Sequence, residues 1–322
     1  MTWSICGTRN TYEFLNTGIS LLKNGGSAVD AVESVIKQVE LNAKDWSVGY
    51  NGFPNLLGYT ELDASIMIGS TRKAGAVAGL KNYLHAISIA RQVMEQSPHV
   101  LLVGEGAELF AKTVGFKELD TLTDSSMNDY YQNVISGNDL FDGMPVPQEI
   151  TDLAWRYDNY IKDQLKRFDY RSWYTKLSHE HHGTVNVIAK DSSGEICSGV
   201  STSGLSLKFP GRAGDSPVIG AGNYCDVRFG AATCVGTGEH AIRLGLARQT
   251  VNYLQNTGSV DKAVKRGIFD LFELDENGII QILAMDKNGK VSACSNTKLH
   301  YIFANDEYPD LQKIDTIYLE KA

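Results

Sequence analysis

The sequence predicts an α+β fold in which β-sheets are stacked between layers of helices. Several segments place apolar residues at helical spacing, and two separate strand–turn–strand patterns turn at residues 191–194 and 286–289. Helices bury one apolar stripe and sheets bury one apolar face, so elements of both kinds pack as layers around a shared core. Hydrophobic periodicity alone does not set the number or the order of these layers.

The first third of the chain alternates between predicted helices and strands. Residues 2–7 should form a strand. A helix over residues 12–23 should end at the Asn-Gly-Gly of residues 24–26, and Ser27 should cap the next helix over residues 28–41. The other elements predicted here are strands at 61–68 and 74–78, a helix at 87–94, a buried strand at 99–103 and a helix at 107–114.

Between residues 119 and 180 the chain becomes polar and aromatic, with one helix expected at 149–168. We interpret this segment as an excursion that leads to a cleavage site, because long loops inside compact domains are commonly functional or linker segments. After it we expect a first hairpin that turns at 191–194, helices at 239–255 and 260–274, and a second hairpin over 279–295.

Composition argues against several classes of protein. The 322 residues carry a formal net charge of −8 and no basic run, which disfavours binding to nucleic acid. The longest apolar runs, such as residues 100–103, are too short for a membrane span, and residues 1–6 lack the basic flank of a signal peptide. The five cysteines are widely spaced and include no Cys-x-x-Cys pair, so we expect reduced, mostly buried thiols in a cytoplasmic protein.

One junction suggests chemistry, because Gly183 directly precedes Thr184, which opens an apolar, strand-like run. If the bond between the two were cut, Thr184 would carry a hydroxyl and a free α-amino group. An α-amine has an ordinary pKa of about 8 and can accept the hydroxyl proton near neutral pH. A threonine hydroxyl activated by its own N-terminal amine is an established type of nucleophile.

Four motifs accompany this junction: His182-Gly183-Thr184, Ser201-Thr202-Ser203-Gly204, Gly211-Arg212-Ala213-Gly214-Asp215-Ser216-Pro217 and Gly220-Ala221-Gly222. Through them the chain resembles the N-terminal nucleophile (Ntn) hydrolases of the glycosylasparaginase and plant-type asparaginase (isoaspartyl peptidase) group. The resemblance leaves out only about residues 118–180. It implies a four-layer αββα sandwich that uses no cofactor and no catalytic metal.

The resemblance also implies a single domain over residues 1–322 that cuts itself between Gly183 and Thr184. Residues 1–183 would form an α-subunit, with a linker at about 118–183, and residues 184–322 would form the β-subunit. Glycine suits the cleaved position because it tolerates strained backbone conformations. The expected assembly is a homodimer of processed αβ protomers.

Individual side chains take roles from the same resemblance. Thr184 would be the nucleophile, and Thr202 would hydrogen-bond its hydroxyl. Arg212 and Asp215 would hold the α-carboxylate and the α-amine of an aspartyl group, because a guanidinium fork matches a carboxylate and an acidic side chain accepts from an ammonium. The alternative for Arg212 and Asp215 is an ordinary surface ion pair, since they lie three residues apart.

The oxyanion site is where the chain departs from its group. The backbone N–H of Gly236 would donate to the oxyanion, but the threonine that assists it in the group falls on Val235, which has no hydroxyl. Loss of one such donor typically slows turnover by about 10²–10³-fold. Thr233 or Thr237 is a candidate to replace it. Glu239, at the start of a predicted helix, is expected only to cap that helix.

Two further departures are Arg9, where glycosylasparaginases have a sugar-facing tryptophan, and Ile68, where the group has an aspartate. The charge of Arg9 motivates the hypothesis that it binds an acidic leaving group, as a substrate-binding residue.

These residues predict an autoprocessing amidohydrolase that cleaves the side-chain amide of a small asparagine derivative, as glycosylasparaginases do. A close alternative is an isoaspartyl peptidase or L-asparaginase, with a β-aspartyl peptide as substrate. The departures support a second class, an uncleaved, non-catalytic homologue that binds an aspartyl ligand. A metal hydrolase built on His179, His181 and His182 is disfavoured because the cluster lacks the His-x-x-x-His spacing of a zinc helix.

Overall fold

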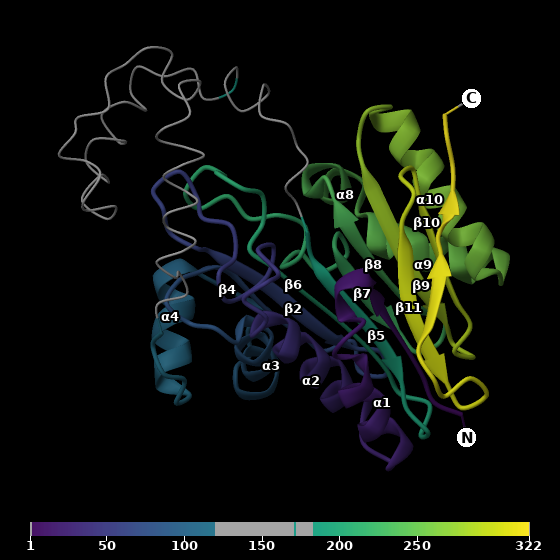
Figure 1. Cartoon of the computed structure of the whole chain (residues 1–322), viewed down its shortest axis with the longest axis horizontal. Helices are drawn as coiled ribbons and strands as arrows, with labels where there is room; N and C mark the ends of the chain where they lie inside the picture. Colours follow the sequence, from purple (N-terminus) through teal and green to yellow (C-terminus); the bar gives the residue numbers. More distant parts are fainter. Residues whose placement is uncertain (1, 120–170, 172–182, 322) are drawn as a thin grey trace.

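The computed structural model describes residues 2–119, 171 and 183–321, so the helix expected at 149–168 lies outside the described residues. The described residues form two β-sheets and two groups of helices, which confirms the predicted α+β class (Figure 1). The larger sheet has the strand order β12-β11-β1-β5-β6-β2-β3-β4, and the smaller has the order β13-β10-β9-β8-β7.

The larger sheet consists of β1 (Ser4–Thr8), β2 (Leu62–Ile68), β3 (Ala74–Leu80), β4 (Leu101–Val103), β5 (Val185–Lys190), β6 (Ile196–Thr202), β11 (His300–Asn305) and β12 (Gln312–Asp315). The smaller sheet consists of β7 (Asn223–Asp226), β8 (Gly230–Gly236), β9 (Ile280–Asp286), β10 (Val291–Ser295) and β13 (Ile317–Tyr318). The helices are η1 (Arg9–Thr11), α1 (Leu15–Lys23), α2 (Ala28–Glu40), α3 (Ala86–Gln96), α4 (Gly104–Thr113), α8 (Gly238–Leu244), α9 (Leu246–Thr257) and α10 (Val260–Leu274).

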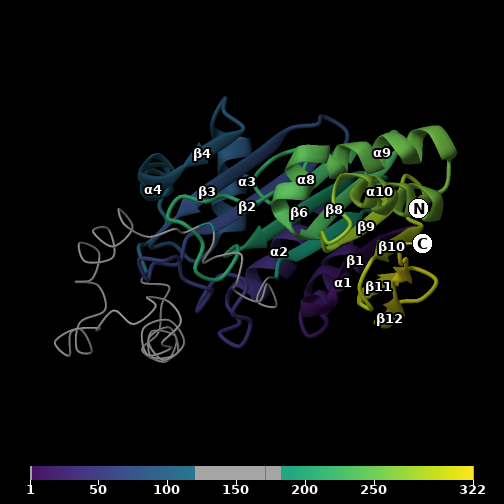
Figure 2. The same cartoon turned by 90° about the horizontal axis from the view of Figure 1, so that it is seen from above.

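Three apolar clusters hold these elements together. One lies between α1–α4 and the larger sheet, and a second lies between α8–α10 and the smaller sheet. The third joins the sheets to each other, with Ile188 from β5 and Leu283 from β9 among its members. Side chains alternate between the faces of a strand, so Val187 joins the first cluster while its neighbour Ile188 joins the third. Figure 2 shows the two helix groups beside different sheets.

Local signals in the sequence account for the elements that were predicted well. Ser27 accepts a hydrogen bond from the backbone N–H of Asp30 at 3.1 Å, which caps α2 as expected. The hairpin after Thr184 forms as β5 and β6, in the register Val185 to Ser201. The second predicted hairpin forms as β9 and β10.

Other expectations were wrong. The strand at 99–103, expected to be buried, is the short edge strand β4, where Leu101 is 42% and Val103 is 59% exposed. The helix expected over 239–255 breaks at Gly245, whose φ of +56° interrupts helical geometry between α8 and α9. Strands β7 and β8 were not anticipated, since the glycine-rich segment before residue 236 shows little alternation. Strands β11, β12 and β13, after residue 295, were not anticipated either.

All five cysteines lie in the described part of the chain, where each is buried and unpaired, as expected. No described helix combines the length and the apolar character needed to cross a membrane.

Candidate active site

Thr184 lies directly before β5, at the end of the sheets where β6 and β8 also finish. Two adjoining pockets meet at this point, and Gly183 and Thr184 line both of them. The smaller pocket is also lined by Thr202, Gly204, Leu205, Arg212, Gly214, Asp215 and Gly236. Six of the seven predicted site residues therefore gather around the smaller pocket, and Arg9 lines the larger one.

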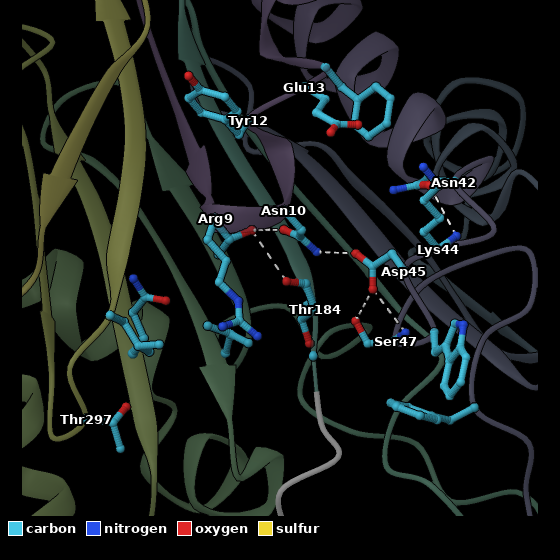
Figure 3. Close-up of a pocket in the computed structure, with 18 of the residues that line it drawn as sticks. Arg9, Asn10, Tyr12, Glu13, Asn42, Lys44, Asp45, Ser47, Thr184 and Thr297 are labelled. Atoms are coloured by element: carbon cyan, nitrogen blue, oxygen red, sulfur yellow. Dashed lines mark hydrogen bonds between the residues drawn. The ribbon is translucent and has the colours of Figure 1, made fainter.

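The larger pocket has a volume of about 790 Å³. Its walls come from η1 and the segment after it, from the loop at residues 42–53, and from β8 and β9 of the smaller sheet. Figure 3 shows Arg9, Asp45, Ser47 and Thr184 around the same hollow. The position that would be cut is thus the boundary between a narrow, charged recess and a wider cavity.

In the connected chain, Thr202 acts on the bond before Thr184. Its hydroxyl donates to the carbonyl oxygen of Gly183 at 2.7 Å, while the N–H of Gly204 donates to the hydroxyl oxygen at 2.9 Å. The hairpin register that pairs Val185 with Ser201 brings these residues together. The sequence predicted a contact with the Thr184 hydroxyl, whereas the contact observed is with the carbonyl that self-cleavage would attack.

Glycine at position 183 is explained by close packing. A Cβ atom built there would overlap both Oγ and Cβ of Ser47. Two overlapping atoms, one of them Cβ, cannot be relieved by rotating the serine hydroxyl alone. A side chain at this position would therefore have to displace the backbone of one of the two segments.

A hydrogen-bond network that the sequence analysis missed lies beside Gly183 and Thr184 (Figure 3). Asp45 accepts from Ser47 Oγ at 2.6 Å and from Asn10 Nδ2 at 2.8 Å. Thr8 Oγ1 donates to Asn10 Oδ1 at 2.8 Å and reaches the carbonyl oxygen of Thr184 at 3.4 Å. The one signal in the sequence that could have marked this network is the glycine-rich run of residues 47–54.

Arg212 and Asp215 both face the smaller pocket but are not each other's ion-pair partners. Arg212 binds Glu239, with Nε and Nη2 at 2.9 and 2.8 Å from the same carboxylate oxygen. The alternative of a surface ion pair between Arg212 and Asp215 is therefore wrong. Arg212 pairs instead with Glu239, which was expected only to cap a helix.

Asp215 is 5% exposed, and its Oδ2 has no hydrogen-bond partner among the described residues. Burial raises the pKa of this carboxyl from an ordinary 3.8 to about 7; Arg212 opposes the rise, and Glu239 adds to it. The carboxylate fits between Gly222 and Gly238, where a Cβ would approach either carboxylate oxygen to within 2.9 Å. A buried acidic oxygen that lacks a donor suits an ammonium ligand.

Charged residues next to the loop of residues 211–215 hold its backbone in place. Both carboxylate oxygens of Glu61 accept from the N–H of Gly211 at 3.1 Å, and Asp63 accepts from the N–H of Gly214 at 3.2 Å. Lys208 is fully buried and donates to the carbonyl oxygen of Glu61 at 3.0 Å. Burial lowers the pKa of Lys208, an effect that the nearby Asp63 and Glu61 oppose. None of these three charged residues was anticipated.

Residues 6–312 match the protein family described as Asparaginase. The chain is 31% identical to the N(4)-(β-N-acetylglucosaminyl)-L-asparaginase of Mus musculus over 96% of this chain and 91% of that protein. It is 36% identical to a plant-type L-asparaginase of Pyrococcus abyssi, covering 87% and 84% of the two chains. It is 32% identical to the isoaspartyl peptidase/L-asparaginase of Mus musculus, covering 84% and 73%. The chain belongs to the asparaginase family.

Three residues differ from those expected at their positions in the family, namely Arg9, Val235 and Ile68. Arg9 lines the larger pocket. Val235 lines the larger pocket, next to Gly236, so the missing hydroxyl concerns the site itself. Ile68 pairs with Cys197 at the far end of β2, whereas Asp63 at the near end pairs with Thr202. Ile68 is thus placed away from the pockets.

Neither residue suggested as a replacement for the missing hydroxyl lines either of the two pockets at Thr184. Thr233 is fully buried deeper along β8, and Thr237 Oγ1 accepts from the N–H of Ile279 at 3.4 Å. Among the described residues, no group of three or more His, Cys, Asp or Glu side chains is arranged to hold a metal ion, and the histidines at 179–182 lie outside the described residues.

Proposed function

We propose that this member of the asparaginase family is an N-terminal-threonine amidohydrolase that hydrolyses the side-chain amide of asparagine-like substrates after cutting its own chain before Thr184. The observation that carries the proposal is the convergence of Thr184, Thr202, Arg212, Asp215 and Gly236 on one pocket. These residues come from separate segments of the sequence, and the fold brings them to one place with the types that a nucleophile and an aspartyl ligand require.

Self-cleavage follows from the contacts around Gly183. The Thr184 hydroxyl attacks the carbonyl carbon of Gly183, and the Thr202 hydroxyl donates to the oxygen that becomes negative, at 2.7 Å in the connected chain. The C–N bond breaks, the released nitrogen takes a proton, and water hydrolyses the resulting ester. The products are residues 1–183 and 184–322, which leaves Thr184 with a free amine.

In the processed enzyme, that amine accepts the proton of the Thr184 hydroxyl. Asp215 accepts from the substrate ammonium, and Arg212 presents its guanidinium to the substrate carboxylate. Binding in the smaller pocket in this way directs the side-chain amide toward Thr184. The hydroxyl attacks the amide carbon, the leaving amine departs with a proton into the larger pocket, and water releases aspartate. Gly236 supplies its N–H to the oxyanion.

The size of the larger pocket bears on the leaving group. A volume of about 790 Å³ exceeds what ammonia requires. The relatives named above are a glycosylasparaginase, a plant-type asparaginase and an isoaspartyl peptidase/asparaginase. GlcNAc-asparagine and β-aspartyl peptides are therefore both candidate substrates, with free asparagine as the smallest.

The architecture we propose is the four-layer αββα sandwich, supported by three apolar clusters that occur in the order helix–sheet, sheet–sheet, sheet–helix. A homodimer of processed αβ protomers remains the proposal drawn from the resemblance, and light scattering of the processed protein tests it. Five buried, unpaired thiols suit a reducing compartment such as the cytoplasm.

Mass spectrometry of purified, aged protein tests the proposal. We expect a fragment that begins at Thr184, and release of aspartate from at least one β-aspartyl amide. The Thr184→Ala variant should stay intact and inactive. A parent protein that stays uncut and turns over none of these substrates would favour the non-catalytic reading, which Val235 in the pocket wall supports.

A further inference from the structure

The larger pocket contains hydrogen-bond donors that nothing in the described structure uses. It lies on the side of Thr184 away from Arg212 and Asp215, where a leaving group would sit. Two of its lining residues, Arg9 and Gln281, come from different elements, η1 and β9.

The side chain of Arg9 is exposed and makes no hydrogen bond or ion pair with a described residue, while its carbonyl oxygen accepts from the backbone N–H of Tyr12 at 3.3 Å. It opens η1 directly after β1, and its side chain extends toward Thr184 (Figure 3). Its charge affects this region: burial lowers the pKa of His300, and the positive charges of Lys313 and Arg9 lower it further. Arg9 thus places a positive charge in the wall of the pocket that Thr184 also lines.

Gln281 is the buried partner in this pair of donors. It is 4% exposed, and its Nε2 has no partner among the described residues. It lies opposite Val235 in the β8–β9 ladder, and it shares the strand face of Leu283, which packs between the sheets. A buried amide donor without an acceptor costs about 1–3 kcal/mol. Such a donor at a pocket wall is best explained by an acceptor on a ligand.

Neither acidic residue of the pocket, Asp45 or Glu13, forms an ion pair with Arg9. Both carboxylate oxygens of Asp45 already accept hydrogen bonds from Asn10 and Ser47. Glu13 is exposed and lies apart from Arg9 and Thr184 in Figure 3. The pocket thus offers the guanidinium of Arg9 and the amide N–H of Gln281, a combination that matches a carboxylate.

We infer that Arg9 and Gln281 form a carboxylate subsite for the leaving group, so that the enzyme selects β-aspartyl peptides with a free C-terminal carboxylate over substrates whose leaving group is uncharged. In a β-aspartyl dipeptide, the leaving amino acid carries a carboxylate one carbon from the scissile nitrogen, whereas ammonia and a glycosylamine carry none. The inference rests on the proposed function and specifies which substrate it prefers.

Two substrates that differ at one group test it. β-Aspartyl-alanine and β-aspartyl-alaninamide share the scissile bond and differ only in the terminal carboxylate. We expect the processed parent to show a kcat/KM about 10- to 100-fold higher for the acid than for the amide, the range for hydrogen bonds to a charged group. Arg9→Met should reduce this ratio toward one, mainly by lowering kcat/KM for the acid, and Gln281→Met should reduce it in part.

Lys44→Met is the matched control, because Lys44 is an exposed cation that lines the same pocket. It should keep the parent's ratio. Equal turnover of acid and amide by the parent, a ratio unchanged in Arg9→Met, or an equal loss of the ratio in Lys44→Met would overturn the inference. A preference for GlcNAc-asparagine over both peptides would also overturn it.

Failure of the proposed function can be distinguished from failure of this inference. If the proposed function is wrong, no substrate is turned over and Thr184 stays linked to Gly183. Arg9 is exposed, so its variant carries the test if Gln281→Met does not fold.

Discussion

Replacing the buried acid of the smaller pocket should make the protein more stable while removing its function. Burial raises the pKa of Asp215 to about 7 from an ordinary 3.8. Below pH 3.8 the carboxyl is protonated in both the folded and the unfolded chain. Between pH 3.8 and 7 the unfolded chain releases the proton while the folded chain retains it, so the free energy of unfolding falls as pH rises. Above pH 7 the folded chain has ionised as well, and the full loss persists.

The size of this loss follows from the pKa difference. At roughly 1.4 kcal/mol for each pKa unit, the rise from 3.8 to about 7 corresponds to a loss on the order of 4 kcal/mol above pH 7. At pH 5 only the first part of that loss has developed. Asp215→Asn cannot ionise, so its stability advantage over the parent should grow by roughly 3 kcal/mol between pH 5 and pH 8.5.

Urea unfolding at the two pH values measures this growth. The comparison is best made in the Thr184→Ala background, where we expect an intact chain and a single unfolding unit. An advantage that is the same at pH 5 and pH 8.5 would show that Asp215 does not keep its proton in the folded state. The reasoning from its burial and its unpartnered oxygen would then be refuted.

Three further predictions concern the reaction. If Asp215 must be ionised to accept the substrate ammonium, kcat/KM should fall as pH drops below about 7; a profile that is flat from pH 5 to 8 would contradict this. Gly183→Ala should slow self-cleavage on a time-course gel, because the added Cβ overlaps Ser47, and Ser47→Gly should restore it in the double variant; no rescue would place the defect elsewhere. Val235→Thr should raise kcat at least about 10-fold by adding an oxyanion donor at the pocket wall, and an unchanged kcat would show that the hydroxyl does not reach the oxyanion.

Much of the candidate site could be predicted because its signals are local. The glycine before Thr184 and the Arg212–Asp215 loop are short runs whose residue types suit a nucleophile and an aspartyl ligand. The structure brings these residues together around one pocket, while their catalytic roles stay predictions. The comparisons confirm the family on which the prediction relied.

The residues that sequence reasoning missed act across long separations. Glu61 and Asp63 bind backbone N–H groups about 150 residues away. Asp45 is an unremarkable loop acid until Asn10 and Ser47 converge on it. Glu239 resembled a helix cap and instead holds Arg212. Apart from the Asp45–Ser47 pair, which spans two residues, none of these contacts has a spacing that the sequence could reveal.

By itself, the sequence determined the elements and motifs whose causes lie within a few residues, such as the Ser27 cap, the hairpin after Thr184 and the Gly183–Thr184 junction, because capping, turn formation and nucleophile activation depend on neighbours in the chain. Only the tertiary structure decided which of the unusual residues matter. Strand order placed Arg9 beside Thr184 and left Ile68 at the far end of β2. Packing of the chain buried the Nε2 of Gln281 and the Oδ2 of Asp215 without a hydrogen-bond partner among the described residues. The free energy of such groups is set by what surrounds them in three dimensions.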